Sequence, residues 1–206
     1  MTDLTTEEKI LKASLKEFSD FGLEGARMDR IAKKAKVNKA MIYYHYKGKE
    51  ALYEKILSGV YGRIYQIIDS IPLEGKSSGE KITSLISGYF EFVSTIEKEY
   101  IRLMIRELAT GGKYFRKLAI PNLVMPVLNL AGSILEEGNK NDIFVDLDPV
   151  YSFIQIVGSI VFSRFIRNAV EGTDIEKMIF REDFLEKYKS NLLTIINNGI
   201  YRKENV

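Results

Sequence analysis

The stretch FSDFGLEGARMDRIAKKAKVNKAMIYYHYKGKEALYEKIL, residues 18–57, carries the strongest structural signal in the sequence. Its apolar side chains recur at helical spacing, which predicts one short helix over residues 27–34 and another over residues 39–44. Asn38, directly before the second helix, is a favourable N-cap. Two short helices joined by a tight turn are typical of a helix-turn-helix.

Side-chain sizes in this stretch fit the crossing of the two helices. Ala32 supplies the small side chain that is needed where the helices cross. Burial of four neighbours is expected to fix the crossing angle: Ile31, Ala35, Val37 and Ile42. The other side chains of the second helix then face outward, which a recognition helix needs if its first residues are to enter the major groove.

The positive charge of the chain is concentrated in one segment. The net charge is +2, but residues 27–49 hold two Arg, six Lys and one acidic residue, a net charge of +7. Such a concentration suits a polyanionic partner. A solvated basic surface without a partner is the alternative, and Lys33 and Lys34 are expected to form such a face.

Several short motifs in fixed register resemble the N-terminal domain of the tetracycline-repressor (TetR) family. They are Phe18-x-x-x-Gly22, Ile31-Ala32, Val37-Asn38-Lys39, Ile42-Tyr43-Tyr44-His45-Tyr46 and Lys49-Glu50-Ala51-Leu52. The resemblance covers about a fifth of the chain. It implies an all-α fold, with a three-helix helix-turn-helix domain at residues 1–47. It also implies a larger helical domain at residues 48–206, for ligand binding and dimerisation.

The resemblance also assigns roles to single residues. The recognition helix would carry Lys39, Ala40, Met41, Tyr43 and Tyr44. Phosphate contacts are expected from Tyr43, Lys49 and His45, and Arg27 could reach a phosphate or a base edge. The alternative for the aromatic residues is the protein core, which is the expectation for Tyr46, and His45 could equally be structural.

Two positions depart from the family pattern. The turn residue that is usually Gly is Lys36, so either the turn differs or Lys36 adopts a positive φ at a cost of roughly 1 kcal/mol. The residue before Arg27, often a capping Thr, is Ala26, which has no side-chain acceptor. The start of the second helix is therefore left open.

The remainder of the sequence also shows helical periodicity, for about nine helices in total. Thr5 and Glu8 offer a capping box for a first helix that ends at Gly22. Further helices are expected over residues 49–69, 79–97, 99–110, a short stretch to 118, 121–137 with a kink at Pro126, 149–170 and 182–201.

Composition excludes several classes of function. The chain has no Cys and one His, which removes disulfide scaffolds, Cys-ligated zinc sites and Cys nucleophiles, and no carboxylate cluster suggests a metal. Residues 50–206 show no Gly-rich phosphate loop and no nucleophile beside a base. We therefore expect no enzyme activity and no cofactor.

The larger domain is expected to bind a second copy of the chain and a small ligand. The resemblance implies a homodimer built from the helices over residues 149–170 and 182–201, unless their apolar residues fill the monomer core. Five polar residues among apolar ones, and the apolar Met125, suggest contacts to a mainly apolar effector: Tyr89, Arg102, Arg106, Asn122, Gln155 and Met125. Surface residues or satisfied buried groups are the alternative for each.

These observations predict a homodimeric transcriptional regulator, a repressor released from a palindromic operator in double-stranded DNA by its ligand. A ligand-independent regulator or activator, and a helical module that binds an acidic protein, are the alternatives. The start MTDLTTEEKI lacks the pattern of a signal peptide, and the apolar stretch over residues 153–162 is too short to span a membrane. We therefore expect a cytoplasmic protein without membrane contact.

Overall fold

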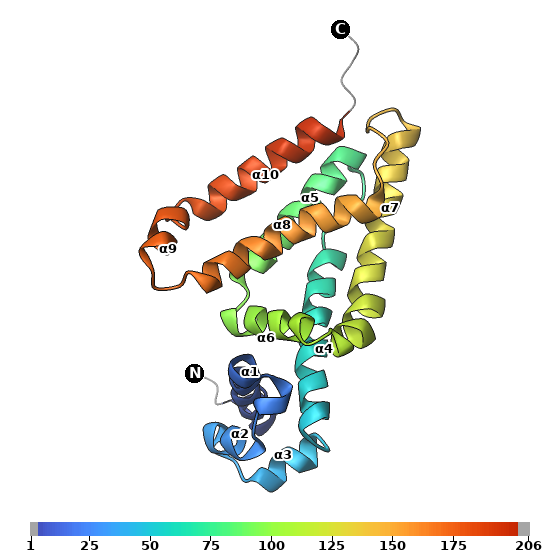
Figure 1. Cartoon of the computed structure of the whole chain (residues 1–206). Coiled ribbons are helices and arrows are strands. Elements are labelled where there is room, and N and C mark those ends of the chain that lie inside the picture. Colours follow the sequence, from blue (N-terminus) through green and yellow to red (C-terminus); the bar gives the residue numbers. More distant parts are fainter. Residues whose placement is uncertain (1–3, 202–206) are drawn as a thin grey trace. The chain divides into compact units, whose positions relative to one another are not determined.

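The computed structural model describes residues 4–201, and within them the regular structure is helical (Figure 1). The elements are α1 Thr6–Gly25, α2 Met28–Ala35, α3 Lys39–His45, α4 Lys49–Asp69, α5 Ser78–Thr95, α6 Lys98–Ala109, η1 Phe115–Val124, α7 Met125–Lys140, α8 Pro149–Ala169, α9 Asp174–Ile179 and α10 Phe184–Ile200. The all-α prediction is confirmed. The ends of the two predicted domains, residues 1–3 and 202–206, lie outside the described residues.

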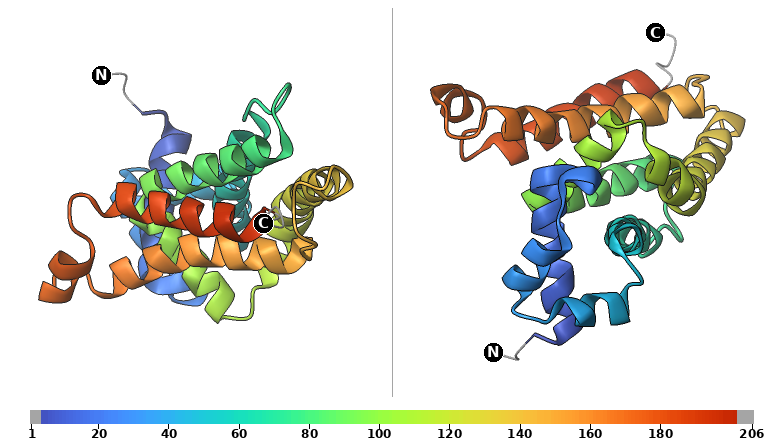
Figure 2. Two further views of the ribbon diagram at one scale, coloured as in Figure 1. Left: turned by 90° about the horizontal axis from the view of Figure 1, so that it is seen from above. Right: turned by 60° about the horizontal axis from the view of Figure 1, so that its bottom comes forward.

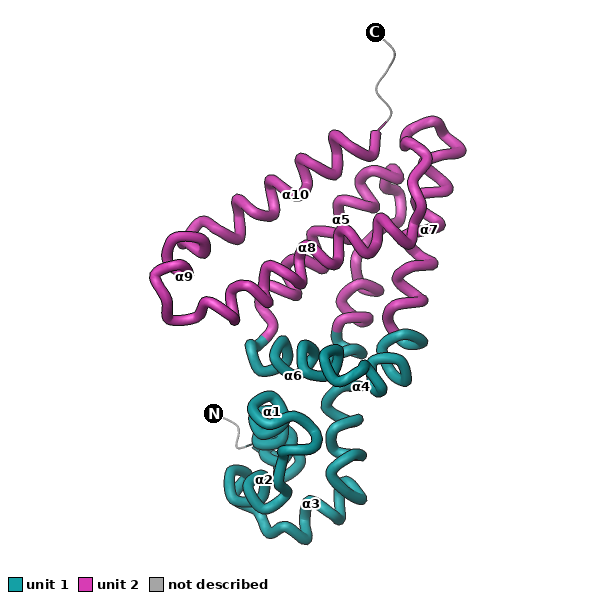
Figure 3. The backbone as a smooth tube through the Cα atoms, viewed as in Figure 1, with its two compact units in different colours: residues 1–63, 97–122 teal, residues 64–96, 123–206 magenta. Residues whose placement is uncertain are grey.

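The chain divides into two compact units (Figure 3). Unit 1 contains residues 1–63 and 97–122, and unit 2 contains residues 64–96 and 123–206. Helix α4 begins in unit 1 and ends in unit 2, so it is a covalent link between them. The predicted boundary at residue 47 falls inside unit 1 and stays a prediction.

Unit 1 is built on α1, which packs against α2 and α6. The predicted capping box is present, because the Glu8 amide donates to Thr5 Oγ1 while Glu8 accepts from the Thr5 amide. Gly22 was expected to end the helix, but it forms a kink at φ 68° and ψ −179°, and helical structure continues to Gly25. Gly tolerates this left-handed φ because it has no Cβ.

Three boundaries differ from the sequence prediction. Pro121 was expected to open a helix, yet it lies inside the π-helical segment η1, and Pro126 is in the first turn of α7 instead of at a kink. The first turn of a helix accommodates Pro126, because the amides there have no partner within the helix. The short helix α9 was not predicted. Its cap is Thr173, which accepts from the Glu176 amide. Residues 4–201 thus hold ten α-helices rather than about nine.

In unit 2, α5 packs against α7, α8 and α10, and α7 packs against α8. The hydroxyl of Tyr188 on α10 donates to the Ser159 carbonyl of α8 at 2.7 Å, and its ring stacks on Phe90 of α5. Figure 2 shows α8 and α10 extending together, with α9 joining their ends. Tyr188 therefore connects α10 to both α5 and α8.

Two helical segments are long and apolar enough to cross a membrane by length and composition, Phe115–Lys140 and Pro149–Ala169. The stretch over residues 153–162 belongs to a helix of 21 residues, so its length does not exclude a membrane span, contrary to the prediction. Such helices also occur in soluble proteins, so this is weak evidence for a membrane. Only 6% of the apolar window in Pro149–Ala169 is buried, however, which leaves an apolar face uncovered.

Candidate DNA interface

Helices α2 and α3 form the predicted helix-turn-helix in unit 1. Ile31 and Ile42 are fully buried, and Ala32 is buried at the crossing. The turn residue Lys36 has φ 56° and ψ 43°, so it adopts the left-handed conformation that Gly usually supplies. The Val37 amide donates to the Ala32 carbonyl at 3.1 Å and closes the end of α2. The family turn is therefore preserved, at a backbone cost of roughly 1 kcal/mol.

Helix α3 buries one side chain and exposes most of the others. Asn38 caps it by accepting from the Ala40 amide at 2.9 Å, and Ile42 is its buried residue. Tyr44 is 82% exposed and Tyr43 is 47% exposed. The exposed set contains the predicted residues Ala40, Met41, Tyr43, Tyr44 and His45. This outward face is what insertion into a groove requires.

Tyr46 ends α3 and belongs to the core, as the sequence predicts. Its side chain is 7% exposed, and its hydroxyl donates to Glu7 Oε1 of α1 at 3.0 Å. Burial, and secondly the Glu7 carboxylate, raises the pKa of Tyr46 above its ordinary value. The hydroxyl therefore stays a donor and holds the end of the recognition helix against α1.

Two predicted contacts to DNA already have partners within the protein. Lys39 Nζ lies 2.8 Å from Asp29 Oδ1, and this hydrogen bond raises the pKa of the Lys39 ammonium. Lys49 Nζ donates to the Glu24 carbonyl at 3.1 Å. Both side chains are partly exposed. DNA would have to compete with Asp29 for Lys39, whereas the carbonyl of Glu24 leaves Lys49 its other two donors.

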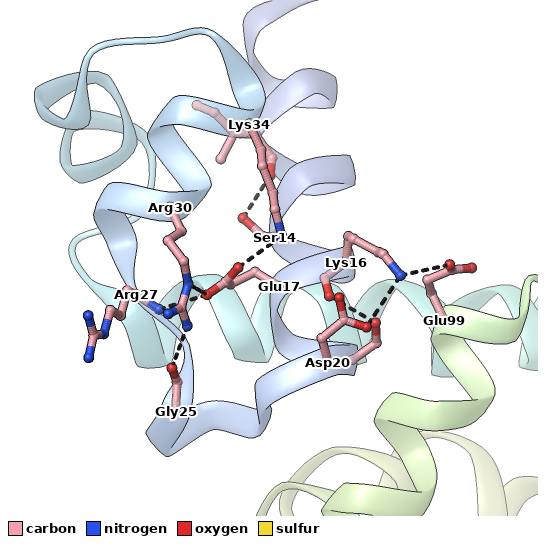
Figure 4. Close-up of polar contacts among 11 residues, drawn as sticks. Ser14, Lys16, Glu17, Asp20, Gly25, Arg27, Arg30, Lys34 and Glu99 are labelled. Carbon is pink, nitrogen blue, oxygen red and sulfur yellow. Dashed lines mark hydrogen bonds and ion pairs between the residues drawn. The ribbon is translucent and has the colours of Figure 1, made fainter.

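A residue that sequence reasoning missed lies behind α2. Glu17 of α1 has a side chain that is 0% exposed. It accepts from the Arg27 amide at 3.2 Å, from Arg30 Nε, and from Lys34 Nζ at 3.0 Å (Figure 4). Burial alone would raise the pKa of the Glu17 carboxyl, but these donors outweigh it and the pKa lies below 4.5. The sequence signal for this buried carboxylate is the position of Glu17, directly before the apolar Phe18 of α1.

Besides Lys39 and Lys49, the cations of the basic segment form two groups. Glu17 pairs with Arg30 and Lys34. Lys34 is exposed, as predicted, and has this ion pair in addition. Four other cations have exposed side chains: Arg27, Lys33, Lys36 and Lys47. Arg27 precedes α2 as its N-cap residue. These exposed cations are the ones best placed to meet phosphates.

The predicted ligand residues do not gather in one unit. Arg102, Arg106 and Asn122 belong to unit 1, whereas Tyr89, Met125 and Gln155 belong to unit 2. In unit 2 Met125 and Gln155 are exposed, and Tyr89 is half-buried with a pKa that burial raises. Asn122 is exposed and donates to the Leu118 carbonyl within η1. Arg102 is half-buried on α6.

Arg106 has a different role from the predicted one. Its guanidinium donates from Nε to the Ser19 carbonyl and from Nη2 to the Asp20 carbonyl, each at 2.8 Å. These carbonyls lie on α1 just before the kink at Gly22. Arg106 therefore joins α6 to α1, and we correct its assignment as a ligand contact.

The neighbouring Glu107 joins α6 to α4 and η1. Its side chain is buried, and its Oε2 accepts from the Tyr53 hydroxyl at 3.1 Å. Its Oε1 accepts from the amides of Tyr114 at 2.6 Å and Phe115 at 3.2 Å. Two adjacent residues on α6 thus hold α1, α4 and the start of η1 in unit 1.

Two short helices lie in a basic segment, and the second of them exposes most of its side chains. This arrangement is that of a helix-turn-helix protein, and comparison with known proteins agrees. The family "Bacterial regulatory proteins, tetR family" matches residues 10–56. The Staphylococcus aureus protein "Biofilm operon icaADBC HTH-type negative transcriptional regulator IcaR" is 31% identical over 100 residues, 48% of this chain and 52% of that protein. The "HTH-type transcriptional repressor NicS" of Pseudomonas putida is 27% identical over 142 residues, 68% of this chain and 66% of that protein.

The whole chain also resembles solved structures. The regulator FadR of Bacillus subtilis, in complex with stearoyl-CoA, has a TM-score of 0.70 at 21% identity, covering 94% of this chain and 98% of FadR. This likeness shows the fold. The match to the tetR family covers residues 10–56, which include the helix-turn-helix. The matched region spans about half the length of the IcaR relatives.

Proposed function

We propose that the protein is a homodimeric transcriptional repressor that recognises a palindromic operator with α3. The exposed face of α3 carries this proposal, because Tyr43 and Tyr44 point outward from a helix that is anchored by Ile42. The surrounding segment has a net charge of +7. Phosphate contacts from its cations would position the domain, and α3 would read the bases.

Selection from a randomised DNA pool tests this function. Sequencing of the bound fraction should reveal one palindrome, Tyr44→Ala should abolish the enrichment, and Lys49→Ala should weaken binding to all sequences alike. Lys177→Ala is the matched control, because Lys177 is 82% exposed on α9 and should not affect selection. Binding without enrichment would instead favour the alternative, a helical module whose basic segment meets an acidic protein.

The homodimer is supported by the uncovered face of α8. Tyr151 is 67% exposed, Ile154 59% and Phe162 61%, and their spacing places them on one helical face. Ile195 on α10 is 61% exposed. Apolar patches of this kind mark interaction surfaces, and a second copy would hold two α3 helices about 34–36 Å apart for successive major grooves.

Two of the exposed residues allow a direct test of the dimer. Ile154→Asp and Phe162→Asp should convert the protein to monomers in sedimentation velocity and weaken operator binding, because each would bury a charge at the interface. Lys177→Asp, on exposed α9, is the control for added charge. Unchanged dimers in both α8 variants would contradict this interface.

We further propose that a mainly apolar effector binds unit 2 and releases the DNA, with Tyr89 as a contact. The support is the fold shared with FadR, whose structure contains stearoyl-CoA, and the half-buried position of Tyr89 on α5. Helix α4 would transmit the change, since it runs from unit 2 into unit 1. Ligand release requires different affinities for the DNA-competent and incompetent states.

Stearoyl-CoA is the first probe for this effector site, and the operator affinity is measured with and without it. A raised operator Kd in the presence of the probe, which Tyr89→Ala removes, supports the coupling. A probe that binds and leaves the operator Kd unchanged contradicts it. The cytoplasm is the proposed location, because the operator lies there in a bacterial cell.

A further inference from the structure

Helix α2 begins without the side-chain cap that usually fixes a helix start. Its N-cap residue Arg27 has extended backbone angles, φ −122° and ψ 127°, and makes no capping hydrogen bond with its side chain. In a capping box, the third helical residue is a Glu or Gln that accepts the N-cap amide. That position is Arg30 in this chain, so the usual acceptor is replaced by a donor.

The missing acceptor comes from another helix. Glu17 of α1 accepts the Arg27 amide at 3.2 Å and is fully buried. Its second oxygen accepts from Lys34 at 3.0 Å, near the end of α2. One carboxylate on α1 therefore holds both ends of α2, through residues that share one helical face (Figure 4).

Arg30 completes the connection from the side of α2. Its Nε donates to Glu17, and its Nη2 donates to the Gly25 carbonyl at 2.8 Å. Its guanidinium lies over the Phe21 ring, 4.2 Å from the centroid. A planar group with three fixed neighbours has little freedom to meet a phosphate.

We propose that Glu17 is a positioning residue for operator recognition, which fixes α2 and thereby α3 against α1, and that Arg30 and Lys34 bind Glu17 rather than DNA. The proposal rests on the proposed DNA-binding function. Because α2 and α3 are packed together, a change in the position of α2 against α1 moves the side chains of α3 that would read bases. A small displacement of this kind lowers the affinity for the operator more than the affinity for unrelated DNA.

Simple electrostatics predicts the opposite effect for Glu17. A buried carboxylate beside a DNA surface repels phosphates, and it also neutralises two cations. If Glu17 acted through charge alone, Glu17→Gln would strengthen binding to operator and scrambled DNA by the same factor. If Glu17 positions α2, the ratio of the two affinities must fall.

The test measures Kd for the selected operator and for a scrambled duplex of equal composition, at one salt concentration. Glu17→Gln should lower the operator-to-scrambled ratio about tenfold, the order of one lost base contact, without weakening the scrambled complex. Arg30→Lys, which keeps the charge and loses the planar fork, should lower the ratio as well. Lys33→Gln is the matched control, because Lys33 is an exposed cation on α2; it should weaken both complexes alike.

The ratio is insensitive to partial unfolding, because a smaller folded fraction raises both Kd values equally. If wild-type protein prefers the operator and Glu17→Gln keeps the ratio within about twofold, or tightens both complexes alike, the positioning role is refuted and the DNA-binding function stands. If wild-type protein has no preference, the proposed function fails and this inference fails with it.

Discussion

Replacing Tyr53 by Phe tests the buried contact that joins α4 to α6. Tyr53 is 2% exposed, and its hydroxyl donates to Glu107 Oε2 at 3.1 Å. Burial first, and then the Glu107 carboxylate, raises the pKa of Tyr53, so the hydroxyl remains protonated at neutral pH. The variant removes one oxygen atom and leaves a buried carboxylate oxygen without this donor.

The loss follows from the chemistry of that oxygen. A hydrogen bond to a charged group contributes about 1.5–3 kcal/mol, so Tyr53→Phe should lower the free energy of unfolding by about 2 kcal/mol. With an m-value of about 2 kcal/mol per molar urea, the midpoint should fall by about 1 M. Urea unfolding followed by circular dichroism measures this at one fixed protein concentration, since the stability of the proposed dimer would depend on concentration.

Tyr65 supplies the matched control on the same helix. Its hydroxyl lies 3.4 Å from Asp69 Oδ1, one turn further along α4, and this contact is exposed to solvent. Tyr65→Phe should therefore change the free energy of unfolding by less than about 0.5 kcal/mol. Equal losses in the two variants, or a loss below about 0.5 kcal/mol for Tyr53→Phe, would refute the reasoning from burial.

Three further variants probe packing, helix propensity and charge, each by urea unfolding. Gly138→Ala should cost about 1–3 kcal/mol, because the new Cβ would collide with the Phe144 ring; unchanged stability would show that the ring can move away. Gly59→Ala should add up to about 1 kcal/mol, because this exposed site inside α4 has open space for a Cβ, and a loss would disprove that. The pKa of Glu17 is lowered below 4.5 in the fold, so its contribution to stability is present above pH 4.5 and is lost as the pH falls through the folded pKa. The stability difference between wild type and Glu17→Gln should therefore shrink from pH 7 to pH 3. A constant difference would contradict this.

Much of the fold was predictable because it depends on local patterns. The short helices of the helix-turn-helix and their Asn38 cap follow from helical spacing and capping chemistry. The positive φ of Lys36 was one of two alternatives, and the structure selects it. Helix α9 and the π-helical turn around Pro121 were missed, because a helix of six residues has a weak periodic signal and proline usually marks a start.

The candidate site was predictable on its exposed side and not on its buried side. Outward residues such as Tyr44 follow from the register of one helix. Glu17 and Arg106 act through helices distant in the sequence, at separations of 17 residues to Lys34 and 87 residues to Ser19. No single-helix pattern contains such partners, so Arg106 was assigned to a ligand.

In the proposed function, two copies of this chain read one palindrome. The most direct measurement is the binding isotherm of purified protein on the selected palindrome and on a scrambled duplex, across rising salt. We expect two chains per palindrome and an affinity ratio of at least about 10³ that persists as salt weakens both complexes. Equal affinity for both duplexes, lost together at moderate salt, would contradict it.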